Sequence, residues 1–179
     1  MYSCHALSLQ ATPGRRRFLK TAALGTGAML FGLARSDRAQ AAGKTDALLL
    51  TCMDYRLMDD IERYMAGRGL RDRYDHVVLA GASLGAVTDR YPAWGQTFWQ
   101  HLDIAIELHH IQQVIIIDHR DCGAYKVLLG EAHAADMATE RGTHAAQLQE
   151  LRRQLQQRKP ALQVETLLMA LDGSVDAVG

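Results

Sequence analysis

Short apolar runs alternate with amphipathic segments between residues 47 and 171. Apolar runs bounded by polar or small residues are typical of buried strands, and apolar positions three or four apart are typical of helices. The pattern predicts strands at residues 48–50, 76–80, 114–118 and 162–171, and helices at residues 57–67, 94–110, 124–130 and 145–159. Because strand and helix alternate throughout, the predicted fold class is α/β with a mainly parallel sheet flanked by helices.

Two segments rich in small or turn-forming residues interrupt this alternation. Residues 81–85 read Gly-Ala-Ser-Leu-Gly, which predicts a loop where the backbone can approach a ligand closely. Asp172 and Gly173 form a hairpin-type turn signal after the last predicted strand.

Reactive side chains follow two of the predicted strands directly. Cys52, Asp54 and Arg56 come after the first apolar run, and alternate residues of an extended segment share a face. His119 and Cys122 come after the third run. If these strands are parallel neighbours, their carboxyl ends meet and form the crevice in which open parallel sheets bind ligands. We therefore expect all five side chains to converge on one point.

The first 41 residues have the features of an export signal. Residues 15–20 read Arg-Arg-Arg-Phe-Leu-Lys, a twin-arginine pattern, and a mildly apolar run follows at residues 21–33. Ala39 and Ala41 provide a small-residue cleavage site. The alternative is a membrane anchor, but the run is shorter than the roughly 20 apolar residues that span a bilayer. We expect the twin-arginine export machinery to deliver the precursor to the periplasm, with cleavage after about Ala41 and one domain at residues 42–179.

The charge of that domain excludes one class of partner. Six of the chain's 20 basic residues and one of its 20 acidic residues lie within residues 1–41. Residues 42–179 therefore carry 14 basic and 19 acidic residues, a net charge of −5 with histidine neutral. A nucleic-acid binder needs a basic surface for phosphates, so we expect no nucleic-acid partner.

The cysteines favour a metal site. Cys4 lies in the predicted signal, which leaves Cys52 and Cys122 in the domain. Two neighbouring thiols in an oxidising compartment could instead form a disulfide. The histidine, aspartate and arginine beside them favour a metal, and two thiolates with one imidazole suit Zn²⁺ and leave a fourth position open. An open zinc site makes hydroxide available near neutral pH.

Asp54 and Arg56 have a natural function beside such a zinc ion. Arg56 would hold the Asp54 carboxylate, and Asp54 would accept a hydrogen bond from the zinc-bound hydroxide. The alternative is a surface ion pair of little energetic value. The spacing of both residues from Cys52 favours the catalytic interpretation. Three other histidines, His101, His133 and His144, fit surface or helix-face positions.

The two motifs together resemble the signatures of the β-class carbonic anhydrases, C-x-D-x-R at residues 52–56 and H-x-x-C-G at residues 119–123. The resemblance extends from the first strand to the turn at Asp172 and Gly173. It implies a zinc enzyme that hydrates CO₂ to bicarbonate and forms homodimers or larger oligomers. It further implies that Cys52, His119 and Cys122 are the zinc ligands, and that Asp54 and Arg56 are the catalytic dyad. In a closed state Asp54 would be a fourth ligand.

The chain departs from this family in two places. The segment at residues 81–85 lacks the usual asparagine, and we place its Gly81, Ala82 and Ser83 in the substrate pocket together with Gly123. The change leaves open a hydrolase of carbonyl sulfide or carbon disulfide on the same zinc site, and a zinc-binding protein without catalysis. Only residues 42–46 precede the first strand of the mature domain, so we expect no N-terminal helical arm.

Overall fold

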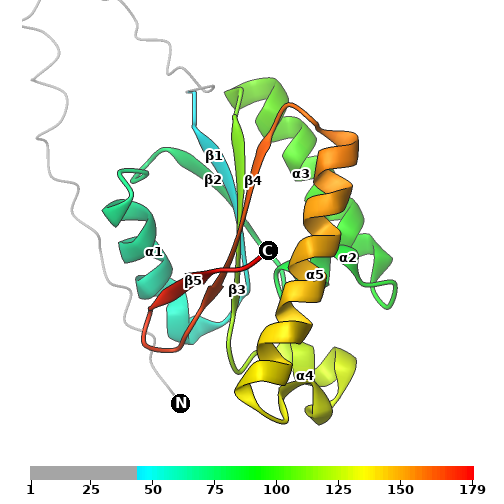
Figure 1. Cartoon of the computed structure of the whole chain (residues 1–179). Helices are drawn as coiled ribbons and strands as arrows, with labels where there is room; N and C mark the ends of the chain where they lie inside the picture. The colour runs from blue at the N-terminus through cyan, green and yellow to red at the C-terminus, as the bar shows by residue number, and fades with distance from the viewer. Residues whose placement is uncertain (1–43) are drawn as a thin grey trace, which may run out of the picture. The chain divides into compact units, whose positions relative to one another are not determined.

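One five-stranded sheet forms the centre of the domain in this computed structural model, which describes residues 44–179 (Figure 1). Its strands are β1 (Ala47–Thr51), β2 (Tyr74–Val78), β3 (Gln113–His119), β4 (Gln163–Met169) and β5 (Val175–Ala177). They are arranged in the order β2-β1-β3-β4-β5. The first four strands are parallel, and β5 pairs with β4 in the antiparallel direction.

Helices cover both faces of this sheet (Figure 1). One face carries α1 (Met58–Gly67), and the other carries α2 (Ser83–Val87), α3 (Pro92–His109), α4 (Gly123–Leu129) and α5 (Met137–Arg158). Two short 3₁₀ helices, η1 (Tyr55–Leu57) and η2 (Glu131–Ala134), precede α1 and α5. The predicted class, an α/β fold with a mainly parallel sheet flanked by helices, is confirmed.

Strand β1 lies between β2 and β3 and is buried on both faces, which explains its unbroken apolar sequence. Leu48 and Leu50 belong to the larger apolar cluster under α2, α3 and α5. Ala47 and Leu49 belong to the smaller cluster under α1. Alternate side chains of β1 thus pack into both halves of the core. This packing holds the strand in place up to its end, where Cys52 follows.

The prediction of a loop at residues 81–85 is wrong in part, because Ser83 begins the short helix α2. Glycine at position 85 reflects close packing here, since a Cβ at Gly85 would lie 2.5 Å from the carbonyl oxygen of Ala80. Five residues with two glycines carry no helical periodicity, so the pattern could not reveal this helix.

Helix α5 begins eight residues earlier than predicted, at Met137. Asp136 caps it by accepting hydrogen bonds from the backbone N–H groups of Ala138 and Thr139. The predicted turn at Asp172 and Gly173 is present between β4 and β5, with Gly173 at a φ of 82°.

The predicted export signal, its cleavage site and the question of an N-terminal arm fall on residues 1–43, outside the described part of the chain. No helix within residues 44–179 is long and apolar enough to cross a membrane.

Candidate metal centre

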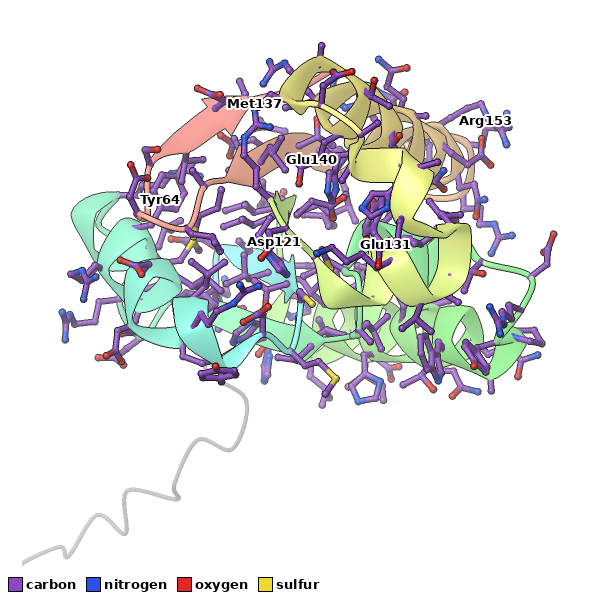
Figure 2. The ribbon with its side chains drawn as sticks, turned by 90° about the horizontal axis from the view of Figure 1, so that it is seen from below. Tyr64, Asp121, Glu131, Met137, Glu140 and Arg153 are labelled. Carbon is purple, nitrogen blue, oxygen red and sulfur yellow. The ribbon has the colours of Figure 1, made fainter. Side chains whose placement is uncertain are left out.

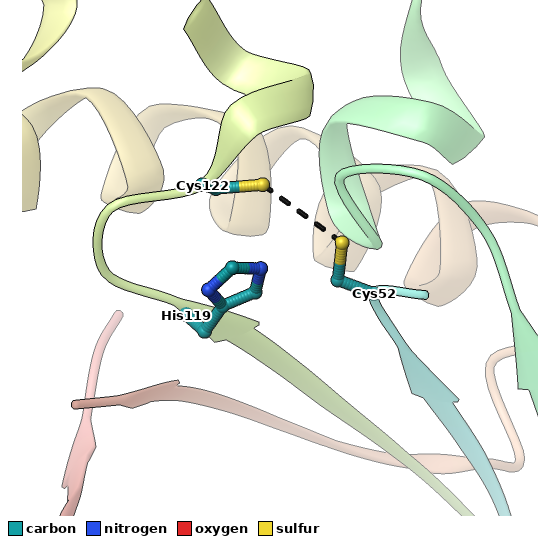
Figure 3. A group of neighbouring side chains, drawn as sticks. All are labelled: Cys52, His119 and Cys122. Atoms are coloured by element: carbon teal, nitrogen blue, oxygen red, sulfur yellow. Dashed lines mark hydrogen bonds between the residues drawn. The ribbon is translucent and has the colours of Figure 1, made fainter. Parts of the chain in front are cut away.

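The carboxyl ends of β1 and β3 bring the predicted ligands together (Figure 3). Thr51, the last residue of β1, pairs with Ile117, and β3 continues for two residues to His119, so both strands end at the same edge of the sheet. Cys52 follows β1, His119 is the last residue of β3, and Cys122 immediately precedes α4. One ligand atom from each residue lies within 4.8 Å of the others.

The donor set fits a zinc ion. The Nδ1 atom of His119 lies 2.8 Å from the carbonyl oxygen of Arg120 and donates to it, which leaves Nε2 with a lone pair. That Nε2 atom is buried and has no hydrogen-bond partner. The sulfur atoms of Cys52 and Cys122 are free and 3.9 Å apart. Two sulfurs on one tetrahedral zinc ion, each about 2.3 Å from it, lie about 3.8 Å apart, whereas a disulfide needs about 2.05 Å.

The surroundings of Cys52 favour its thiolate. A hydrogen bond with Cys122 is the main cause that lowers the pKa of the Cys52 thiol, and His119 acts in the same direction. The backbone N–H of Gly81 also lowers this pKa, because it donates to the Cys52 sulfur at 3.3 Å. Thiolate is the form that binds metal, so the contacts with Gly81 and His119 prepare Cys52 as a ligand, whereas the hydrogen bond with Cys52 raises the pKa of Cys122.

Asp54 and Arg56 form a two-pronged ion pair beside the ligands. Arg56 donates from Nε to Oδ1 of Asp54 at 2.9 Å and from Nη2 to Oδ2 at 2.7 Å. Hydrogen bonding with Arg56 lowers the pKa of Asp54 to about 2, so its carboxylate is ionised at neutral pH. Oδ2 of Asp54 lies 3.7 Å from Nε2 of His119. The carboxylate therefore borders the three-residue cluster while Arg56 holds it.

Asp121 gives Arg56 a second anchor, which the sequence analysis missed. The Asp121 carboxylate accepts hydrogen bonds from Arg56 at 2.9 Å and from Lys126 at 2.8 Å, and these two cations lower its pKa. The backbone N–H of Asp121 donates to the Glu140 carboxylate at 2.6 Å. This hydrogen bond stabilises the left-handed backbone conformation of Asp121, whose φ is 55°. Figure 2 shows Asp121 and Glu140 near each other at this end of the molecule. Arg56 is thus fixed between two carboxylates.

A cavity of 610 Å³ opens beside Cys52. Its wall is mostly apolar and combines Met53, Tyr55, Ala80, Tyr91, Trp94, Ala124, Val127 and Leu128 with the dyad, Asp121, Gly123 and Lys126. Gly123, which the sequence analysis placed in the substrate pocket, lines this cavity. Gly81, Ala82 and Ser83 are buried and do not line it, so their placement in the pocket is corrected.

Two histidines expected at surface or helix-face positions are in fact buried. His144 is fully buried, and its Nδ1 lies 2.9 Å from the carboxylate of Asp118. His133 is 6% exposed, and its Nδ1 lies 2.7 Å from the carbonyl oxygen of Gly130. Both lie beside the ring of Tyr125, which packs in the core. His144 lies four, seven and eleven positions before Leu148, Leu151 and Leu155, so the apolar pattern of α5 was the signal for this buried position.

The fold of the domain is similar to that of solved carbonic anhydrases. Two solved carbonic anhydrase structures share the fold. A carbonic anhydrase from Streptococcus mutans has a TM-score of 0.50 at 20% identity, covering 76% of this chain and 83% of the other. The β-carbonic anhydrase CafD of Aspergillus fumigatus has a TM-score of 0.54 at 12% identity, covering 75% and 90%.

A family model described as "Putative carbonic anhydrase" matches residues 42–179. The chain belongs to this family. An uncharacterised protein of Rickettsia conorii is 38% identical over 143 residues, which is 80% of this chain and 77% of the relative. A second uncharacterised protein, from Rickettsia bellii, is 37% identical over 142 residues, which is 79% of this chain and 87% of the relative.

Proposed function

We propose that this protein is a zinc-dependent carbonic anhydrase that reversibly hydrates CO₂ to bicarbonate. The observation that carries the proposal is the unpartnered Nε2 of His119, buried between two free thiols and 3.7 Å from the Asp54 carboxylate. Membership of the carbonic anhydrase family supports the same activity.

Cys52, His119 and Cys122 would hold the zinc ion. When bound, zinc acts as a Lewis acid that supplies a strong nucleophile from water at neutral pH. Asp54 is ionised and accepts hydrogen bonds only, so it fixes the direction of the attacking oxygen's proton. Arg56 holds Asp54 in this position through its two hydrogen bonds and would keep the carboxylate from binding the metal.

The cavity supplies the environment for a small apolar substrate. Met53, Trp94 and Val127 are among the apolar side chains that line it, and such a wall favours CO₂ over water. Arg56 and Lys126 stand in the same cavity and provide positive charge for the anionic product.

The same cavity supports a second candidate substrate class. Carbonyl sulfide and carbon disulfide are also small and linear, and the mostly apolar wall suits them as well. A zinc-binding protein without catalysis is a third alternative. Stopped-flow CO₂ hydration measured beside sulfide release from the two sulfur substrates separates all three.

We expect CO₂ hydration by the zinc-loaded protein to exceed the uncatalysed rate strongly and sulfide release to be low. If sulfide release is the dominant activity, the protein is instead a hydrolase of carbonyl sulfide or carbon disulfide. Zinc-loaded protein inactive on all three substrates would contradict an enzymatic role.

We also propose a homodimer or higher homo-oligomer. Large apolar side chains are exposed around the cavity, with Met53 at 65%, Tyr55 at 85% and Val127 at 68% exposure. A monomer rarely leaves such a patch in water, so a second subunit would bury it. Light scattering of the purified protein measures the oligomeric state directly.

Export to the periplasm by the twin-arginine route is the proposed localisation. Residues 15–20 carry the arginine pattern. A precursor with Arg16→Lys and Arg17→Lys is expected to remain in the cytoplasm, as fractionation and immunoblotting would show. The matched control, Arg35→Lys, keeps the pattern and should be exported normally. Unchanged periplasmic protein in the double variant would contradict the route.

A further inference from the structure

Asp118 is a buried carboxylate with four hydrogen-bond donors, directly before the ligand His119. Its side chain is 1% exposed. Oδ1 accepts from the backbone N–H of Ser83 at 3.0 Å. Oδ2 accepts from the Ser83 hydroxyl at 2.7 Å, the Tyr125 hydroxyl at 2.6 Å and Nδ1 of His144 at 2.9 Å. Burial raises the pKa of Tyr125 well above its usual range, so its hydroxyl remains a donor.

The segments tied to Asp118 contact or carry the candidate metal ligands. Ser83 begins α2 two residues after Gly81, whose N–H donates to the sulfur of Cys52 at 3.3 Å. Tyr125 lies in the first turn of α4, and that helix begins directly after Cys122. Asp118 itself precedes His119 in β3. One carboxylate therefore links the surroundings of all three ligands.

The backbone between Gly81 and Ser83 needs such a restraint. Gly81 has a φ of 79° and Ala82 a φ of 42°, and an alanine in this region is strained. A strained turn persists only where its surroundings determine it. Here the N–H of Gly81 is fixed by Cys52 and the N–H of Ser83 by Asp118, one on each side of Ala82.

We propose that Asp118 is a positioning residue that fixes the three metal ligands in their binding arrangement through Ser83, Tyr125 and His144. The inference rests on the proposed zinc site but not on the identity of the substrate. Partners that orient metal ligands from outside typically change metal affinity by about 10–100-fold when mutated.

Asp118→Asn is the direct test, because an amide cannot accept from all four donors. If its NH₂ group replaces Oδ2, it faces three donors. If it replaces Oδ1, it faces only the N–H of Ser83, so this orientation is favoured and the contact that holds the turn is lost. We expect zinc to transfer to the chelator 4-(2-pyridylazo)resorcinol at least about 10-fold faster than from the wild type.

Thr166→Val is the matched control. The Thr166 hydroxyl is also buried, accepts from Arg152 at 2.6 Å and donates to the carbonyl oxygen of Val178, away from the ligands. Thermal unfolding of both variants measures the stability that each loses. We expect Thr166→Val to release zinc within about twofold of the wild-type rate, even if its melting temperature falls by as much as that of Asp118→Asn.

The visible spectrum of the cobalt-substituted protein gives a second readout that does not depend on activity. Thiolate-to-cobalt bands should shift in Asp118→Asn and remain unchanged in Thr166→Val. If Asp118→Asn does not fold, Tyr125→Phe removes one donor and keeps the carboxylate, and it should still release zinc about threefold faster than the wild type.

Three results distinguish this inference from the proposed function. Wild-type zinc release rates in Asp118→Asn, or equal acceleration in Thr166→Val, would overturn the positioning role alone. A wild-type protein that holds zinc but hydrates no CO₂ would overturn the function and leave the positioning role intact. A wild-type protein that binds neither zinc nor cobalt would overturn both.

Discussion

Arg56→Ala is expected to retain its zinc and to lose CO₂ hydration activity by a factor of about 10²–10⁴, the range of positioned acid–base groups. Arg56 donates to both oxygens of Asp54 and is itself fixed by Asp121. The Asp54 carboxylate already lies 3.7 Å from Nε2 of His119. Without the guanidinium it would be free to move in among the three ligands and to bind the metal in place of water. The three ligands are untouched, so zinc content should not change.

Asp54→Asn should produce a loss of similar size, because an amide offers a donor where an acceptor is needed. The double variant should be little worse than either single variant, since groups that act as a unit are not additive. Stopped-flow kcat and zinc content are the two measurements.

Arg63→Ala is the matched control for the dyad, because it removes an exposed arginine paired with Asp60 on α1. It should leave both zinc content and kcat unchanged. Full activity in Arg56→Ala, or loss of zinc from it, would mean that the pair with Asp54 is only structural.

His119→Ala is expected to weaken zinc binding by about 10²–10⁴-fold and to abolish activity. Zinc binding to structural sites contributes about 10–16 kcal/mol in total, so the loss of one of three protein ligands costs about 3–5 kcal/mol. Competition with a chelator measures the affinity. His109→Ala, which breaks a pair with Asp75 at the opposite end of the sheet, should bind zinc normally. Wild-type affinity in His119→Ala would contradict the assigned ligand set.

The sequence predicts the four parallel strands from local pattern, and it predicts the ligand cluster if β1 and β3 are neighbours, whereas the short strand β5 (Val175–Ala177) was not predicted. The apolar run before Cys52 predicts a strand buried on both faces, and β1 is such a strand. Parallel neighbours must end at the same edge, so Cys52 and Cys122 could be placed together before their 3.9 Å separation was known.

The partners of the ligands could not be predicted because they depend on long-range packing. Asp118 and His144 are 26 residues apart, and the leucines of α5 place His144 on the buried face of the helix without showing which residue it contacts. The pairing of Arg56 with Asp121 joins the 3₁₀ helix η1 to a loop 65 residues later in the chain. Residues 81–85 look like a loop in sequence, yet Ser83 turns inward to Asp118, away from the cavity.

Zinc stoichiometry, measured together with X-ray absorption at the zinc edge, tests the central claim most directly. Purified protein should contain one zinc per subunit with two sulfur neighbours at about 2.3 Å and one nitrogen neighbour at about 2.0–2.1 Å. Less than a tenth of an equivalent of zinc, together with a Cys52–Cys122 disulfide by mass spectrometry, would contradict it.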